Sequence, residues 1–186
     1  MINHNVKGTG VMSTRTYVKS RHNDEFKSWL NSLPSNSNKI YTDTINSTNW
    51  YNIEDAYLSP MKLIAQRFFD GDEKTAALDI GKYSAEYGLK GVYKVFLLKA
   101  SPQTLMKASK RIISVYYDKV KVEIDDIKKK SLVLSCTRIT NKNELFDYRT
   151  IGWCVKALEL ANCKNVNYEN VEANSEDMFA FKLSWD

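Results

Sequence analysis

The chain has 186 residues, of which 43% are hydrophobic and 26% charged, a composition that fits one ordinary globular domain. Its net charge of +5 is too small and too dispersed to predict a nucleic-acid-binding protein, and the densest basic cluster, Lys128–Lys130, is expected in a hairpin turn. Residues 1–20 lack the apolar core of a signal peptide, and no apolar run is long enough to span a membrane. The number of cysteines, three, is odd. A cytoplasmic protein with reduced thiols is therefore predicted.

The N-terminal part is expected to be helical after an extended segment at residues 1–11. A first helix is predicted to begin at Ser13 or the next residue and to end at Arg21. A second would begin at Asn23 or Asp24 and run to Leu33, because the apolar positions 26, 29, 30 and 33 recur with helical spacing. The polar segment Pro34–Asn38 reads as a loop and as the one internal boundary.

Two helices follow in the middle of the chain. Glu54–Phe69 is strongly amphipathic, and Pro60 either kinks it or marks its true start. After a turn at residues 70–72, Glu73–Tyr87 is predicted to be helical and to end at Gly88. The side chains on its inner face are unusually small around Gly81, so another helix is expected to approach it closely.

Two further helices precede the predicted sheet. Lys90–Lys99 is expected to be short. Ser101 and Pro102 form a helix start signal, with a capping side chain followed by a proline in the first turn. The helix from there would turn apolar residues as far as Tyr116 inward.

The last third switches to an alternation of apolar and polar residues at 120–125, 132–136 and 179–185, which predicts strands with one buried face. The helix Asn143–Asn162, in which Gly152 again permits close approach, interrupts these strands. We therefore predict an α+β fold in which N-terminal helices pack on a C-terminal four-stranded antiparallel sheet of ββαββ order. The single domain 1–186 would comprise a helical elaboration (1–50), a helical layer (51–119) and the sheet unit (120–186).

Several short segments, taken in order, carry a resemblance over nearly the whole chain. They are KGT from Lys7, WY from Trp50, DIG from Asp79, GVYKVFL from Gly91, SP from Ser101, RTIGWCVKALEL from Arg149 and F-x-L-x-W from Phe181. Together they resemble a bacterial family first catalogued in myxobacteria. That family belongs with the superfamily of heme–nitric-oxide-binding domains, TRAPP vesicle-tethering subunits and 4-vinyl-reductase sensor domains. The resemblance implies a ligand cavity between helices and sheet.

The branches of this superfamily imply different ligands, which the residues can test. The heme branch needs an axial histidine before the sheet, and no histidine occurs after His22. Its Tyr-x-Ser-x-Arg motif matches here at Leu134, Cys136 and Arg138, where only the arginine survives. The sensor branch implies zinc bound by C-terminal cysteines, and no cysteine follows Cys163. Neither heme nor a metal is therefore expected, and no cofactor is predicted.

The acylated branch needs a cysteine that opens into an apolar channel. Cys136 and Cys154 are candidates, and inert buried thiols are the more ordinary interpretation.

The predicted binding site is an elongated apolar cavity beside the sheet. Arg138 would hold a ligand carboxylate there, or it has a carboxylate partner within the protein, or it reaches water at a strand end. The aromatic lining residues are expected to be core residues in the simpler interpretation. The six predicted ligand-binding residues are Tyr116, Leu134, Cys136, Arg138, Tyr148 and Trp153.

The predicted function is a non-enzymatic sensor of a hydrophobic small molecule such as a fatty acid. The alternative is a structural interaction module that resembles TRAPP subunits and holds no exchangeable ligand. An enzyme is disfavoured, because no nucleophile and base are paired and no histidine lies in the body of the fold. A homodimer is predicted through a patch of Trp29, Leu30 and Leu33.

Overall fold

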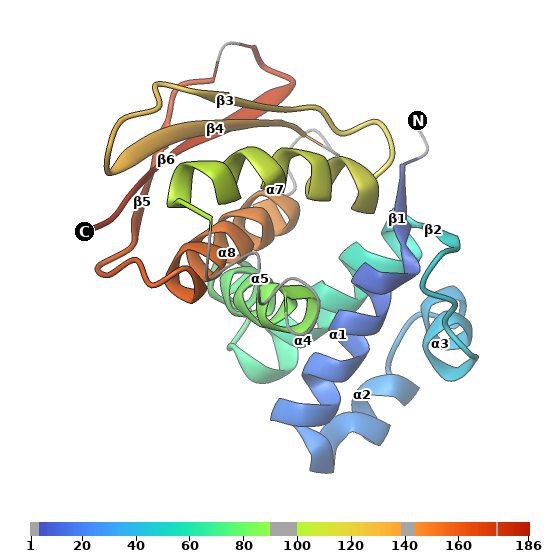
Figure 1. The fold of residues 1–186 in the computed structure, drawn as a ribbon. Helices are drawn as coiled ribbons and strands as arrows, with labels where there is room; N and C mark the ends of the chain where they lie inside the picture. The colour runs from blue at the N-terminus through green and yellow to red at the C-terminus, as the bar shows by residue number, and fades with distance from the viewer. Residues whose placement is uncertain (1–3, 90–99, 139–143, 174) are drawn as a thin grey trace.

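The computed structural model describes residues 4–89, 100–138, 144–173 and 175–186 and has helices on one side of a sheet (Figure 1). The N-terminal elements are β1 (Asn5–Lys7), α1 (Gly8–Arg21), a 3-10 turn (Asn23–Glu25), α2 (Phe26–Asn31), α3 (Ser35–Thr42) and β2 (Trp50–Asn52). Next come a π-helical turn (Glu54–Leu58), α4 (Ser59–Phe68), α5 (Glu73–Leu89) and α7 (Pro102–Tyr116). The C-terminal elements are β3 (Val122–Asp125), β4 (Ser131–Thr137), α8 (Glu144–Leu160), β5 (Asn167–Val171) and β6 (Met178–Ser184).

The C-terminal unit forms an antiparallel sheet in the order β3-β4-β6-β5, with α8 inserted between β4 and β5. Leu134 pairs with Ile124 on one side and with Phe181 on the other. The alternation along β4 and β6 buries one face of the sheet beneath α7 and α8, which lie against it in Figure 1. The predicted α+β fold and the ββαββ order are confirmed.

The helices α5 and α8 cross at two glycines. A Cβ atom on Gly81 would overlap the carbonyl oxygen of Arg149, and one on Gly152 would overlap the carbonyl oxygen of Leu78. Each glycine therefore lies against the backbone of the opposite helix. The close approach predicted from the small face of α5 is confirmed, and α8 packs on α5 while it also contacts α7 and the sheet.

The N-terminal part departs from the sequence-based expectation in two places. The first helix begins at Gly8, after β1 has paired with β2 in a small antiparallel ribbon that was not predicted. The segment Pro34–Asn38 is not a loop, because Ser35–Thr42 is helical and Pro34 precedes its first turn. Burial of Tyr41, whose hydroxyl donates to the carbonyl of Ala56 at 2.9 Å, anchors this polar helix.

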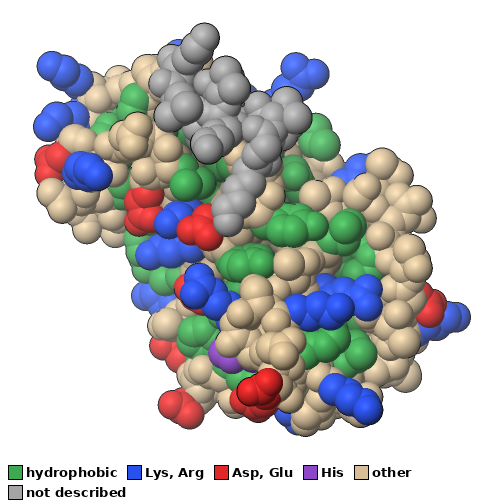
Figure 2. Space-filling model, turned by 60° about the horizontal axis from the view of Figure 1, so that its bottom comes forward, with side chains coloured by type: hydrophobic (Ala, Val, Ile, Leu, Met, Phe, Trp, Pro, Cys, Tyr) green, Lys and Arg blue, Asp and Glu red, His purple; other side chains and the backbone are tan. Residues whose placement is uncertain are grey.

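The patch predicted to form a dimer lies inside the chain. Trp29 is fully buried, with its ring 5.3 Å from that of Tyr41, and Leu33 is buried as well. Neither is available to a second copy, whereas Leu30, the third residue of the patch, is half-buried; the patch as predicted is wrong, and the homodimer stays a prediction. On the face that Figure 2 shows, positive, negative and apolar side chains are interspersed rather than gathered by type.

The helix boundaries in the middle of the chain resolve two open points. Pro60 lies in the first turn of α4, directly after the π-helical turn Glu54–Leu58, so α-helical geometry begins there although the chain is already helical before it. Gly88 is not a terminator, because α5 continues to Leu89. The turn after α4 is confirmed, since Asp70 and Gly71 adopt φ angles of 51° and 86°. The predicted helix Lys90–Lys99 lies outside the described residues.

The start of α7 allows a direct test of helix capping. Ser101 accepts a hydrogen bond from the backbone N–H of Thr104 at 3.2 Å, and Pro102 follows it as predicted. Ser101→Ala should lower the free energy of unfolding by about 1 kcal/mol, because that N–H loses its partner. Urea denaturation measures the change. Ser114→Ala, on the exposed side of the same helix, is the matched control and should leave stability within about 0.5 kcal/mol.

Candidate functional site

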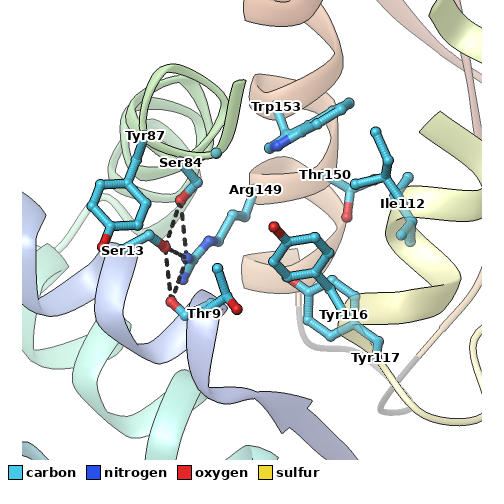
Figure 3. Close-up of a pocket in the computed structure, with 13 residues that line it drawn as sticks. Thr9, Ser13, Ser84, Tyr87, Ile112, Tyr116, Tyr117, Arg149, Thr150 and Trp153 are labelled. Carbon is cyan, nitrogen blue, oxygen red and sulfur yellow. Dashed lines mark hydrogen bonds between the residues drawn. The ribbon is translucent and has the colours of Figure 1, made fainter. Parts of the chain in front are cut away.

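A cavity of about 50 Å³ lies where α1, α5, α7 and α8 converge (Figure 3). One part of its wall is polar and the other aromatic and aliphatic. The residues that line it are Thr9, Gly10, Ser13, Ser84, Tyr87, Gly88, Ile112, Ile113, Tyr116, Tyr117, Arg149, Thr150 and Trp153. Such a mixed wall, with a few polar groups among apolar ones, is typical of a small-molecule site.

Arg149 is the charged residue of this wall. It comes from α8, is only 2% exposed, and extends toward α1 and α5 (Figure 3). Its guanidinium donates to the hydroxyls of Thr14 at 2.8 Å, Ser13 at 2.9 Å and Ser84 at 3.0 Å. It also contacts the carbonyl of Gly10 at 3.2 Å, so a single side chain joins three helices.

Buried phenols surround the guanidinium. Arg149 lies over the ring of Tyr57 at 4.3 Å, and the hydroxyl of Tyr117 donates to that of Tyr57 at 2.7 Å. Burial raises the pKa of both tyrosines above that of a free phenol, although the charge of Arg149 opposes the shift. Both phenols therefore stay protonated and neutral at physiological pH.

The six predicted ligand-binding residues do not form one site. Tyr116 and Trp153 line the cavity at Arg149. Arg138 and Tyr148 line a second cavity, of about 470 Å³, on the other side of α8. Leu134 and Cys136 line neither cavity, because the helices pack directly on this part of the sheet and leave both side chains fully buried.

Arg138 already has a carboxylate partner in the protein. Its guanidinium lies 3.6 Å from the carboxylate of Asp147, and its Nε donates to the carbonyl of Met178 at 3.1 Å. This is one of the three alternatives that the sequence left open. The second cavity is also lined by Glu144, Glu172 and Glu176, so negative charge outweighs positive charge around it.

Arg149 was not among the six residues predicted to bind the ligand. It belongs to the segment RTIGWCVKALEL, which was used only for its likeness to a family. The missed signal is its position on the helix: Leu145, Arg149 and Gly152 share one face by their spacing of four and three residues. Because Gly152 marks the face that another helix approaches, an arginine one turn away is placed in the interior.

The cavity does not fit a heme group. Heme needs an axial ligand and a slot for a large planar macrocycle. Neither histidine is at the cavity: His4 is near Asp118, at 3.9 Å, and His22 stacks on Phe68 at 3.8 Å. The phenol of Tyr117 is neutral and already bonded to another tyrosine, and a space of about 50 Å³ holds only a few waters.

The cysteines are buried and free. Burial raises the pKa of Cys136 well above its usual value and that of Cys154 to about 12, so neither presents a reactive thiolate. This argues against the acylated alternative. Among the described residues no group of three His, Cys, Asp or Glu side chains is placed to hold a metal ion.

Comparisons with known proteins give a likeness in structure but not in sequence. No protein-family model and no curated protein matches the sequence. An H-NOX protein from S. oneidensis, in the Fe(II) ligation state, superposes with a TM-score of 0.74 at 11% identity over 97% of this chain and 96% of the other. The Fe(II) unliganded H-NOX A71G mutant from K. algicida gives 0.72 at 12% identity over 97% and 96%.

A third solved structure is an oxygen-binding H-NOX domain related to soluble guanylate cyclases, with a TM-score of 0.67 at 11% identity over 96% of this chain and 92% of the other. No helix in the part of the chain that the structure describes is long and apolar enough to cross a membrane. The likeness extends over nearly the whole length of each chain, and it confirms the fold relationship that the sequence predicted. The chain therefore has the fold of H-NOX domains.

Proposed function

We propose that this chain is a non-enzymatic sensor domain that binds a small, mainly apolar molecule in the cavity at α1, α5, α7 and α8, without heme. The observation that carries the proposal is the cavity itself, which combines an aromatic wall with a cluster of converging polar groups. The H-NOX fold supports a ligand-binding role by analogy, because the similar structures are described by their iron and oxygen ligation.

The size of the cavity revises the ligand that the sequence suggested. A ligand such as a fatty acid was predicted in an elongated cavity beside the sheet, lined in part by Leu134 and Cys136. Both side chains are fully buried in direct packing, and about 50 Å³ has room for only a few water-sized groups. A ligand of about five non-hydrogen atoms, such as a short-chain fatty acid or alcohol, fits this space.

The alternative of an interaction module has less support. Large exposed hydrophobic side chains among the described residues are Trp50, Val115 and Ile127, and they belong to three separate parts of the chain. Trp50 is in addition covered by the ammonium group of Lys7 at 4.0 Å. Single exposed hydrophobic residues are ordinary on a protein surface and do not indicate an interface.

A cavity-filling substitution tests the proposed function. Gly88 lines the cavity, and a Cβ atom there would have the hydroxyl of Tyr116 as its nearest neighbour at 3.7 Å, an ordinary contact. Gly88→Leu should therefore fold normally and occupy the space. We expect wild-type protein to bind 1-propanol or propionate and Gly88→Leu to lose that binding, as measured by NMR titration of the cavity residues.

Gly88→Ala is the matched control for this experiment. It adds a single methyl group, leaves most of the cavity free, and should retain binding. Equal binding by wild type and Gly88→Leu would show that the ligand lies elsewhere. Absence of any binding by wild-type protein would contradict the proposed function as a whole.

A further inference from the structure

We propose that Arg149 makes the cavity a receptor for the charged end of a small carboxylate. This rests on the proposed function, and it adds the chemical class of the ligand. The ligand's carboxylate would pair with the guanidinium, and its short apolar part would lie against Ile112 and Trp153.

In the part of the chain that the structure describes, the positive charge of Arg149 has no negatively charged partner. Its hydrogen-bond partners are all neutral: three hydroxyls, one carbonyl and the sulfur of Met61 at 3.3 Å. No carboxylate among the described residues forms an ion pair with it, and residues 1–3, 90–99, 139–143 and 174 contain no Asp or Glu. A guanidinium does not lose its proton in proteins, so a full positive charge is buried here without a counter-charge.

No other side chain nearby supplies a negative charge. Tyr41, Tyr57 and Tyr117 lie close enough for the charge of Arg149 to act on them, and burial raises the pKa of each. Burial likewise keeps the thiols of Cys136 and Cys154 protonated. Asp147 is two residues away on α8, but it is paired with Arg138 on the other side of the helix. The cavity is therefore electropositive.

The guanidinium of Arg149 also has one N–H donor, at Nε, that is not used within the described residues. Its Nε is buried and donates to no atom of the protein. An unpaired buried donor is costly, and a carboxylate oxygen would satisfy it. The terminal nitrogens of the guanidinium already donate to Thr14, Ser13 and Ser84, so Nε is the donor that remains for a carboxylate oxygen.

A purely structural role does not account for the charge. Arg149 connects Ser13, Thr14 and Ser84, but these hydroxyls bear no net charge and so do not neutralise the guanidinium. Arg138 provides the contrast within the same protein, since its guanidinium lies 3.6 Å from the carboxyl group of Asp147. The two arginines therefore form a matched pair, one with a carboxylate of its own and one without.

The test compares propionate with propionamide, which has nearly the same shape and no charge. Binding is followed by the NMR shifts of the Thr150 amide and the Trp153 indole at fixed pH and ionic strength. We expect wild-type protein to prefer propionate by about tenfold, the ratio that one charge-assisted hydrogen bond provides. Arg149→Met should reduce the ratio to about one, and Arg138→Met should leave it unchanged.

Arg149→Lys guards against a variant that fails to fold. It retains the positive charge and should keep a reduced preference for propionate. If Arg149→Met is unfolded, the ratio of the affinities for propionate and propionamide is compared between wild-type protein and Arg149→Lys instead. Equal affinity for propionate and propionamide in wild-type protein overturns the assignment of Arg149. The proposed function survives that outcome provided Gly88→Leu still abolishes binding of both compounds.

Discussion

Alanine at Gly81 or Gly152 is expected to lower the free energy of unfolding by roughly 1–3 kcal/mol or more, because overpacking at a rigid contact forces the two helices apart. At Gly81 the added methyl group would overlap the carbonyl of Arg149 and lie 3.0 Å from the backbone nitrogen of Trp153. Backbone atoms cannot rotate away as a flexible side chain can. Leucine at either position should be worse than alanine.

The matched control lies on the same helix as Gly81. A Cβ atom at Gly88 would make only an ordinary contact, 3.7 Å from the hydroxyl of Tyr116, and alanine has a helix propensity about 1 kcal/mol better than glycine. It should therefore leave the protein as stable as wild type or slightly more stable. Chemical denaturation of the three variants gives the comparison. If Gly81→Ala proved as stable as Gly88→Ala, the close crossing of α5 and α8 would be contradicted.

The same glycines show why the sequence predicted the arrangement of the core well. A small face on a helix has one physical use, which is to let another backbone approach, and it was visible at both Gly81 and Gly152. The alternation along residues 132–136 and 179–185 likewise has one solution, a sheet with one buried face. Strong periodic patterns of this kind fix both the type of each element and the face that it buries. The α+β fold could therefore be predicted from them.

The errors occurred where the local pattern was weak. The segment Ser35–Thr42 contains mostly polar residues, and its helix depends on Tyr41, which packs on Trp29 and donates to the carbonyl of Ala56. The same burial removed Trp29 from the surface, although its helical spacing suited an exposed patch equally well. An amphipathic pattern predicts that one face of a helix is buried. It does not predict whether the same chain or a second molecule covers that face.

The candidate site was predicted in part, because residues on one helix can face different cavities. Tyr148 and Trp153 were both predicted to line one site, yet α8 separates the two cavities that they line. Which arginine is paired also depends on this geometry. Arg138 and Arg149 are equivalent as letters in a sequence, and only the position of Asp147 beside one of them distinguishes their roles.

Asp147 is expected to make the protein more stable at pH 5 than at pH 8. Burial raises the pKa of its carboxyl group to about 7, against 3.8 for an exposed aspartate, and the charge of Arg138 offsets only part of that shift. The charge of Glu144 raises it slightly further. Between these two pKa values the folded protein holds a proton on Asp147 that the unfolded chain has released.

The sign of the effect follows from this difference in bound protons. The free energy of unfolding should fall as pH rises from 4 to 7, and the contribution of Asp147 should be constant above its folded pKa. The total is roughly 2–4 kcal/mol, at about 1.4 kcal/mol per unit of pKa difference. Other carboxylates titrate in the same range, so the quantity to measure is the difference in urea-denaturation stability between wild type and Asp147→Asn at each pH.

Two further variants separate the causes of the shift. Arg138→Met removes the charge that lowers the pKa of Asp147, so the pH-dependent range should extend to higher pH. Glu144→Gln removes a neighbouring negative charge and should move the range slightly to lower pH. The carboxyl titration can be read directly by NMR. A stability difference between wild type and Asp147→Asn that does not vary between pH 4 and pH 8 would show that Asp147 is solvated, and that the second cavity admits water as far as the Arg138–Asp147 pair.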